Sequence, residues 1–273
     1  MPVMAAMPLS VMRGLGDLTG WLVYVLPIRS SQISRRNIEL CFPEMDATQQ
    51  RRLVHKSLRN DGRTMLEMPR LWRRHQTVDL DIGNFDEVRQ RAETEGKGAL
   101  ILAPHLGSWE ALTPVLHQLP GFAYLYRPPD NPMVARLIVG QRAQSQAEAV
   151  PADSSGMRRL FRIASAGRCI GILPDQKPKR GGKGVDAPFF GIPTPTMVLV
   201  AKLIQRYQMP SYYAVCLREG GRYRVLFEPT PAEIADPDPL ASASAMNLGI
   251  EQLVRRCPEQ YQWSYRRFPR ALY

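Results

Sequence analysis

The sequence has few cysteines and no pattern that would pair them. Its 273 residues include four, Cys41, Cys169, Cys216 and Cys257, and no Cys-x-x-Cys occurs. This spacing argues against structural zinc and against a disulfide framework, and it fits a reducing compartment. Linkers rich in Gly, Ser or Pro, internal repeats and low-complexity segments are also missing. With a globular composition of 44% hydrophobic and 22% charged residues, we expect one large domain, or one domain with an added arm.

A run long enough to span a membrane is missing as well. Residues 1–28 are the most apolar region, but Arg13 and Asp17 interrupt them, leaving uncharged stretches of about a dozen residues. No basic segment precedes the apolar stretch, which argues against a signal peptide. A stripe of apolar residues recurs at helical spacing: Leu15, Leu18, Leu22 and Val25. The stripe predicts a helix that lies on or dips into a membrane, with a helix docked on the protein's own core as the alternative.

Positive charge is in excess. Lys and Arg number 36 against 25 Asp and Glu, a net charge of +11, so the protein needs an anionic partner. Nucleic acid, a phospholipid surface and a phosphorylated substrate all qualify. Five arginines follow the apolar helix where anionic headgroups would meet them: Arg29, Arg35, Arg36, Arg51 and Arg52. Because each contributes roughly 1 kcal/mol near an anionic leaflet, we predict a membrane-associating helical arm over residues 1–78.

Beyond the arm, apolar runs alternate with helical patterns. The runs predict buried strands at 99–103, 123–126, 169–173, 212–217 and 223–227. Helices are predicted at 46–74, with Asp46 as N-cap, and at 85–95, 109–119, 132–146, 156–166 and 196–207. This alternation predicts an α/β domain over residues 79–273, with a largely parallel central sheet flanked by helices. Ligands of such sheets lie beyond the carboxyl ends of the strands, so chemistry is expected directly after Ala103.

His105 and Glu110 are the candidate acid–base pair at that strand end. On one continuous helix their five-residue separation would point the side chains about 140° apart. They can meet only if His105 lies in a loop and Glu110 in the first turn of the next helix. Gly107 permits the bend and Ser108 is a good N-cap. Glu110 would then fix the imidazole tautomer and leave the other nitrogen as a general base.

No protein nucleophile, metal site or cofactor motif accompanies this pair. The sequence lacks Gly-x-Ser-x-Gly, Gly-x-Gly-x-x-Gly, a Walker loop and His-Glu-x-x-His. We expect His55, His75 and His117 to be structural or surface residues. The pair would therefore activate a substrate hydroxyl for group transfer. Basic runs with aromatics at 72–74 and 263–267 leave a non-catalytic nucleic-acid or membrane binder as the alternative, although no nucleic-acid-binding signature accompanies them.

The segment Pro104–Glu110, PHLGSWE, resembles the catalytic block of the lipid A biosynthesis acyltransferases of Gram-negative bacteria. That family lies within the His-x4-Asp/Glu glycerolipid acyltransferases. Further similar blocks follow the family's order, so the resemblance covers nearly the whole chain: 34–44, 126–132, 172–176, 188–191 and 258–268. Ser108 departs from the commoner Asn, and the stretch after Gln176 departs in charge and length. Both departures concern the identity of the acceptor more than the reaction type.

The resemblance implies a membrane-associated O-acyltransferase without a cofactor. His105 would be the general base and Glu110 its orienting partner. A hydroxyl of a glycolipid, such as a lipid A precursor, would attack an acyl thioester of acyl carrier protein or coenzyme A. The implied location is the cytoplasmic face of the inner membrane, with no nucleic acid as partner. A lysophospholipid, a phosphatidylinositol mannoside or another amphiphilic alcohol is the alternative acceptor.

The resemblance also implies that four residues bind substrate: Arg127, Asn131, Asp175 and Gln176. Arg127 would hold an acceptor phosphate, with a surface ion pair as the alternative. Asp175 and Gln176 would shape the acceptor site or form a structural turn. The basic, glycine-rich loop at 177–184 would contact the carrier protein or lipid phosphates, or be solvated. Phe189 and Phe190 either line an acyl pocket or pack in the core.

Overall fold

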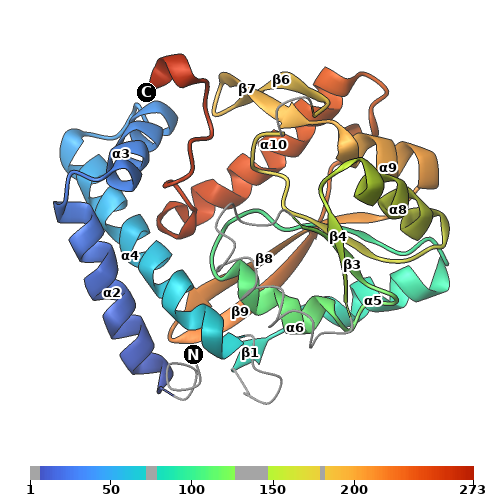
Figure 1. The fold of residues 1–273 in the computed structure, drawn as a ribbon, viewed down its shortest axis with the longest axis horizontal. Coiled ribbons are helices and arrows are strands. Elements are labelled where there is room, and N and C mark those ends of the chain that lie inside the picture. The colour runs from blue at the N-terminus through green and yellow to red at the C-terminus, as the bar shows by residue number, and fades with distance from the viewer. Residues whose placement is uncertain (1–6, 72–78, 127–146, 179–181) are drawn as a thin grey trace.

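The computed structural model describes residues 7–71, 79–126, 147–178 and 182–273 (Figure 1). Its centre is a seven-stranded sheet in the order β1-β9-β8-β2-β5-β3-β4. The strands are β1 (Leu80–Asp81), β2 (Leu100–Leu102), β3 (Ala123–Tyr126), β4 (Glu148–Pro151), β5 (Ile170–Ile172), β8 (Ser211–Glu219) and β9 (Arg222–Pro229). Neighbouring strands run parallel except β8 and β9. The predicted α/β fold with a largely parallel sheet is therefore confirmed.

Helices cover both faces of the sheet. Side chains along each strand point alternately to opposite faces, and apolar residues on both faces must be buried. Leu100 and Leu102 of β2 join one core cluster, and Ile101 joins the other. The first cluster includes residues of α8 (Ser154–Ser165), α9 (Leu199–Tyr207) and α10 (Pro239–Arg256). The second includes residues of α5 (Phe85–Thr94) and α6 (Thr113–Leu116).

The five predicted apolar runs all form strands, and four predicted helices occur at their expected places. Helix α4 (Ala47–Leu71) begins where expected, because Asp46 Oδ1 accepts the N–H groups of Thr48 and Gln49 at 2.7 and 2.8 Å. Helices α5 and α8 lie close to their predicted bounds. Helix α9 begins at Leu199 instead of residue 196, because Thr196 and Met197 end a strand. The helix predicted at 132–146 lies outside the described residues.

Several elements were not predicted. They include α3 (Arg29–Cys41), β1, β4, the long helix α10, and a two-stranded antiparallel sheet of β6 (Gly184–Phe189) and β7 (Ile192–Met197). Strand β7 contains Pro193 and Pro195, which usually argue against a strand. A two-stranded ribbon tolerates them because the edge that faces away from its partner needs no ladder donor.

The N-terminal helix α2 (Leu9–Val25) packs closely along α4 (Figure 1). A Cβ on Gly16 would lie 2.6 Å from the Cα of Arg63, so the contact between the helices depends on glycine. Asp17 forms ion pairs with Arg59 and Arg63, each at 2.6 Å. Both helices are thus joined by backbone packing and by charge.

The apolar stripe of α2 faces away from the protein. Leu15, Leu18, Leu22 and Val25 are 44–52% exposed, whereas Met12, Gly16 and Gly20 are buried against the protein. The predicted helix is therefore present, and its apolar stripe is not docked on the core. Within the described ranges, no helix combines the length and the hydropathy needed to cross a bilayer.

Helices α3 (Arg29–Cys41) and α4 share the core of the sheet. Ile38 and Leu58 belong to the same buried cluster as Leu100 and Tyr213. The segment predicted as an arm is therefore packed onto the α/β unit through a common hydrophobic core.

Candidate active site

The loop after β2 places His105 at the carboxyl end of the sheet. Gly107 adopts a φ of +70°, and its N–H donates to the Gln260 carbonyl at 2.9 Å. A Cβ at this position would lie 2.9 Å from the carbonyl carbon of Cys216. Glycine is thus required both for the left-handed backbone and for the close approach of β8. The predicted tight bend is confirmed.

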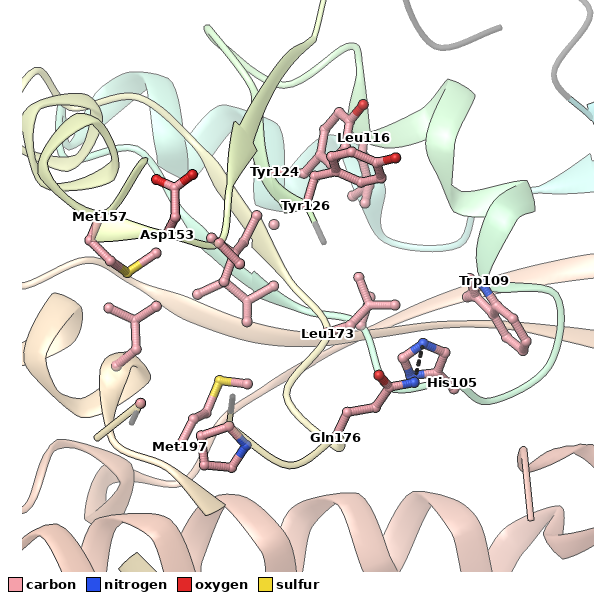
Figure 2. Close-up of a pocket in the computed structure, with 18 of the residues that line it drawn as sticks. His105, Trp109, Leu116, Tyr124, Tyr126, Asp153, Met157, Leu173, Gln176 and Met197 are labelled. Carbon is pink, nitrogen blue, oxygen red and sulfur yellow. Dashed lines mark hydrogen bonds between the residues drawn. The ribbon is translucent and has the colours of Figure 1, made fainter. Parts of the chain in front are cut away.

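Asp175 holds the Nδ1 side of His105. Its Oδ1 lies 2.8 Å from Nδ1, and its Oδ2 accepts the His105 backbone N–H at 3.0 Å. Because an ionised carboxylate can only accept hydrogen bonds, Nδ1 carries the proton when the imidazole is neutral, and Nε2 then has the free lone pair. The Gln176 amide nitrogen lies 3.2 Å from Nε2 (Figure 2). It can therefore donate to the basic nitrogen until a substrate hydroxyl takes its place.

Sheet register explains why these residues meet. Leu102 of β2 pairs with Ile172 of β5, and the parallel strands end level with each other. His105 and Asp175 each follow three residues after that pair. The sequence placed both at one edge of the sheet, but their contact depends on β2 and β5 being neighbours.

Glu110 lies where the sequence predicted, but a different carboxylate holds Nδ1. It occupies the first turn of the 3₁₀ helix η1 (Trp109–Leu112) and is 5% exposed. Glu110 and His105 line the same cavity, while Asp175 takes the position at Nδ1 that we expected for Glu110. Ser108 is at the N-cap, yet its hydroxyl makes no capping bond and is buried without a partner among the described residues.

The Asp175 carboxyl is stabilised in its ionised form. Burial alone would raise its pKa, but the charge of His105 and the hydrogen bonds from the His105 ring and backbone outweigh burial, and the pKa is lowered. Burial, together with the charge of Asp175, raises the pKa of the Tyr261 phenol well above its ordinary value. The Trp109 ring meets the imidazole edge-on at 5.1 Å between centroids. The imidazole is thus fixed by an anionic partner and by packing.

A cavity of about 950 Å³ extends from His105 (Figure 2). Most of its wall is apolar, including Leu116, Phe122, Met157, Phe161, Leu173 and Met197. Three lysines add positive charge to its lining: Lys177, Lys183 and Lys202. A mainly apolar cavity of this size with a few convergent polar groups suits a ligand with a long hydrocarbon part. Phe189 and Phe190 are buried in the core cluster and do not line this cavity.

A buried polar network fixes the His105 loop from behind. The Gln260 carbonyl accepts the N–H of Gly107 and the side-chain amide of Asn60, at 2.9 and 3.1 Å. The Gln260 side chain accepts the backbone N–H of Arg218 and donates to its C=O, at 2.9 and 3.2 Å. The Arg218 guanidinium binds Glu67, which is 0% exposed. Gln260 lies within the block 258–268 that resembles the family, and the sequence alone predicts no role for it.

Some of the remaining predicted site residues cannot be placed, and Lys177 has contacts within the protein. Arg127, Asn131, Lys179 and Arg180 lie outside the described residues. Lys177 is held by the C-terminal segment, where its backbone N–H donates to the Tyr265 hydroxyl at 3.1 Å and its ammonium to the Phe268 carbonyl. Burial first, and then nearby arginine charge, lowers its pKa.

The four cysteines are buried and unpaired. Burial raises the pKa of the Cys169 thiol to about 11 and that of Cys216 to about 12. Thiols of this kind are poor nucleophiles near neutral pH because little thiolate is present.

Comparison with known proteins gives one consistent result. The family model for bacterial lipid A biosynthesis acyltransferase matches residues 1–270. The chain is 25% identical over 268 residues to a lipid A biosynthesis palmitoleoyltransferase of Escherichia coli strain K12, covering 96% of this chain and 86% of that protein. It is 25% identical over 271 residues to a lauroyltransferase of lipid A biosynthesis from the same strain, with the same coverage of 96% and 86%. It is also 26% identical over 271 residues to a lipid A biosynthesis acyltransferase of Haemophilus influenzae, covering 96% and 85%.

Proposed function

This chain belongs to the bacterial lipid A biosynthesis acyltransferase family, and on that premise we propose that it moves a fatty acyl chain from an acyl thioester to a hydroxyl of a lipid A precursor. The observation that carries the proposal is the Asp175–His105 pair, which presents a basic Nε2 to a large, mainly apolar cavity. The similar proteins named for lauroyl and palmitoleoyl transfer support a fatty acyl substrate.

His105 acts as the general base in this proposal. Its Nε2 takes the proton of the acceptor hydroxyl as the oxygen attacks the thioester carbonyl carbon, and the C=O bond becomes an oxyanion. Collapse of that intermediate re-forms the C=O bond and breaks the C–S bond. The imidazolium returns its proton to the leaving thiolate, so the products are an ester and a thiol. Asp175 stabilises the imidazolium between these two transfers, as carboxylates do in hydrolase triads.

Glu110 is the second carboxylate of the site. We assign it to the cavity wall beside Trp109, because the position at Nδ1 is taken by Asp175. Arg127 and Asn131 are assigned to the acceptor, with Arg127 holding a phosphate through its planar fork of donors. The donor is assigned as the thioester of acyl carrier protein, because the lysines that line the cavity suit an acidic carrier and its phosphate.

The exposed stripe of α2 is assigned to the membrane surface, at the cytoplasmic face of the inner membrane. Its large apolar side chains, 44–52% exposed at Leu15, Leu18, Leu22 and Val25, are followed directly by the arginines of α3. Apolar area next to positive charge is the combination that binds anionic bilayer surfaces. An acceptor anchored in the same leaflet would then reach the site without leaving the bilayer.

A transfer assay tests this function. Detergent-purified protein is incubated with acyl carrier protein thioesters or acyl-coenzyme A and a panel of acceptors: a lipid A precursor, a lysophospholipid and a phosphatidylinositol mannoside. Mass spectrometry then identifies the acylated product. Acylation of the lipid A precursor from the carrier thioester is the expected result. Acylation of another lipid alone would keep the mechanism and overturn the acceptor, and no transfer to any acceptor would overturn the function.

A further inference from the structure

A second, smaller hollow lies between α3 and the C-terminal segment, apart from the active site. Its volume is about 160 Å³, and it is lined by Arg29, Gln32, Ile33, Arg36, Arg266 and Tyr273. None of these residues lines the cavity that contains His105. The α3 residues recur at the spacing of one helix face. Three guanidinium groups therefore converge on one small space.

The positive charge of this hollow is only partly neutralised by the protein. Arg36 pairs with Glu39 at 3.2 Å and donates to the Leu272 carbonyl at 2.7 Å. Among the residues that the structure describes, Arg29 has no hydrogen-bond or ion-pair partner. Arg266 stacks over the Tyr273 ring at 5.0 Å, and its Nε is buried with no partner within the described chain. A buried N–H donor of this kind calls for an acceptor.

The hollow adjoins the apolar surface assigned to the membrane. Helix α2 ends at Val25, and the residues between it and Arg29 include Leu26 and Ile28, which are 48% and 40% exposed. Helix α3 begins at Arg29, and the C-terminal end of the chain lies beside α3 (Figure 1). The three arginines therefore lie next to the apolar surface that we assign to the leaflet, where lipid phosphates would be within reach.

We infer that Arg29, Arg36 and Arg266 form a binding site for the phosphate group of an anionic phospholipid. This inference rests on the membrane contact in the proposed function and gives that contact a specific ligand. Planar guanidinium forks match phosphate oxygens bidentately, which an ammonium group does not do. The volume of the hollow is also roughly ten times the smallest cavity volume that can hold one water molecule, so it has room for a multi-atom anion.

Vesicle binding by the full chain tests the site. Vesicles of phosphatidylcholine alone are compared with vesicles of equal parts phosphatidylcholine and phosphatidylglycerol. The R29Q/R266Q variant should bind the anionic vesicles about 30-fold more weakly than wild type, since two arginines at roughly 1 kcal/mol each give that factor. Its binding to neutral vesicles should match wild type, which shows that the fold and the apolar stripe are intact. The matched control R158Q/R162Q removes the same charge from exposed positions of α8 and should bind both vesicles like wild type.

A second variant separates a built site from diffuse attraction. R29K/R266K keeps the net charge but loses the forked donors, so the site predicts clearly weaker binding to anionic vesicles. Wild-type binding by R29K/R266K would overturn the inference in favour of general surface charge. Unchanged vesicle binding in R29Q/R266Q with a raised KM for a phosphorylated acceptor would overturn the phospholipid as ligand and assign the same chemistry to the acceptor. Vesicle binding requires no turnover, so a protein that binds vesicles but transfers no acyl chain would refute the proposed function alone.

Discussion

Asp175 contacts His105, whereas Glu110 lines the cavity, and these surroundings predict different roles for the two carboxylates. Asp175→Asn should lower kcat by roughly 10²- to 10⁴-fold with little change in KM, because an amide can donate to Nδ1 and favour the tautomer that protonates Nε2. Glu110→Gln should cost less, since Asp175 occupies Nδ1. Steady-state kinetics of both variants provide the measurement. A kcat near wild type in Asp175→Asn, together with a strongly lowered kcat in Glu110→Gln, would show that Glu110 is the residue that orients His105.

Asp61 on α4 predicts an unusual dependence of stability on pH. It accepts the Ser264 hydroxyl at 2.7 Å, and its Oδ1 is buried without a partner among the described residues. Burial raises its pKa to about 7, against the opposing Ser264 hydrogen bond and Arg218 charge. The unfolded carboxyl titrates near 3.9. Between roughly pH 4 and 7 the folded chain therefore binds a proton that the unfolded chain has released, and the free energy of unfolding falls as pH rises.

Comparing wild type with Asp61→Asn isolates this contribution. The variant should gain stability relative to wild type across that window, by at most roughly 4 kcal/mol, and the gain should level off above about pH 7. Denaturant unfolding over a pH series measures both proteins. Parallel stability curves for wild type and Asp61→Asn would contradict the assignment.

For single residues, the sequence identifies His105 but not all of its hydrogen-bond partners. The strand end before Pro104 and the block around His105 locate the base directly. Asp175 and Gln176 are placed at the same edge, yet their hydrogen bonds follow from β2 lying beside β5. Strand order is a long-range property that neither residue spacing nor apolar periodicity encodes.

Among the elements, the packing of α2 on α4 depends on glycine at particular positions. A Cβ at Gly20 would lie 2.6 Å from the backbone nitrogen of Arg59, whereas a Cβ at Gly14 meets nothing within 4 Å. Gly20→Ala should therefore destabilise the protein by about 1–3 kcal/mol through overpacking. Gly14→Ala should stabilise it by about 0.5–1 kcal/mol, since alanine favours the helix. Thermal unfolding compares the two, and a shift of the same sign in both would argue against close contact between the helices.

The segment carrying Gln260 positions the His105 loop, and the chain offers a matched control. Gln260 hydrogen-bonds both backbone groups of Arg218 on β8, as Asn84 does with Phe227 on β9 at 3.0 and 3.3 Å. Gln260→Leu and Asn84→Leu should each lose about 1–3 kcal/mol of stability from unpaired backbone groups. Only Gln260→Leu should also lower kcat, roughly tenfold, with KM unchanged, because a misplaced base weakens the transition state alone.

Assays well below both melting temperatures separate positioning from unfolding. Equal kcat in Gln260→Leu and Asn84→Leu would show that the Gln260 side chain contributes to stability alone and does not position His105. A fall in kcat confined to Gln260→Leu supports the link from Gln260 to Gly107.

Most elements follow from local patterns, and the exceptions have identifiable causes. The five buried runs form strands because continuous apolar residues suit a sheet covered on both faces. Strand β7 was not predicted because it contains two prolines. Helix α10 was not predicted because its Ser- and Ala-rich start lacks apolar periodicity, although Asp238 caps it. Helix α2 was predicted with its exposed stripe, since the polar and small residues off that stripe are the ones that contact the protein.

For the whole molecule, helices α2, α3 and α4 and the sheet form one packed unit. Ile38, Leu58 and Phe42 share a core with Trp263 near the end of the chain. The division at residue 78 therefore remains a prediction about function, with the membrane surface assigned to one part and acyl transfer to the other. Composition and periodicity predict the α/β class, whereas the joining of the two parts depends on contacts far apart in sequence.

One measurement tests the central claim most directly: the rate of acyl transfer from carrier thioester to lipid A precursor by wild type and His105→Gln, followed by mass spectrometry. Glutamine retains polarity and much of the side-chain volume but cannot accept a proton near neutral pH. We predict that the ester product falls by at least about 10²-fold in His105→Gln, while vesicle binding and melting temperature stay near wild type. Transfer at an undiminished rate in His105→Gln would contradict the account.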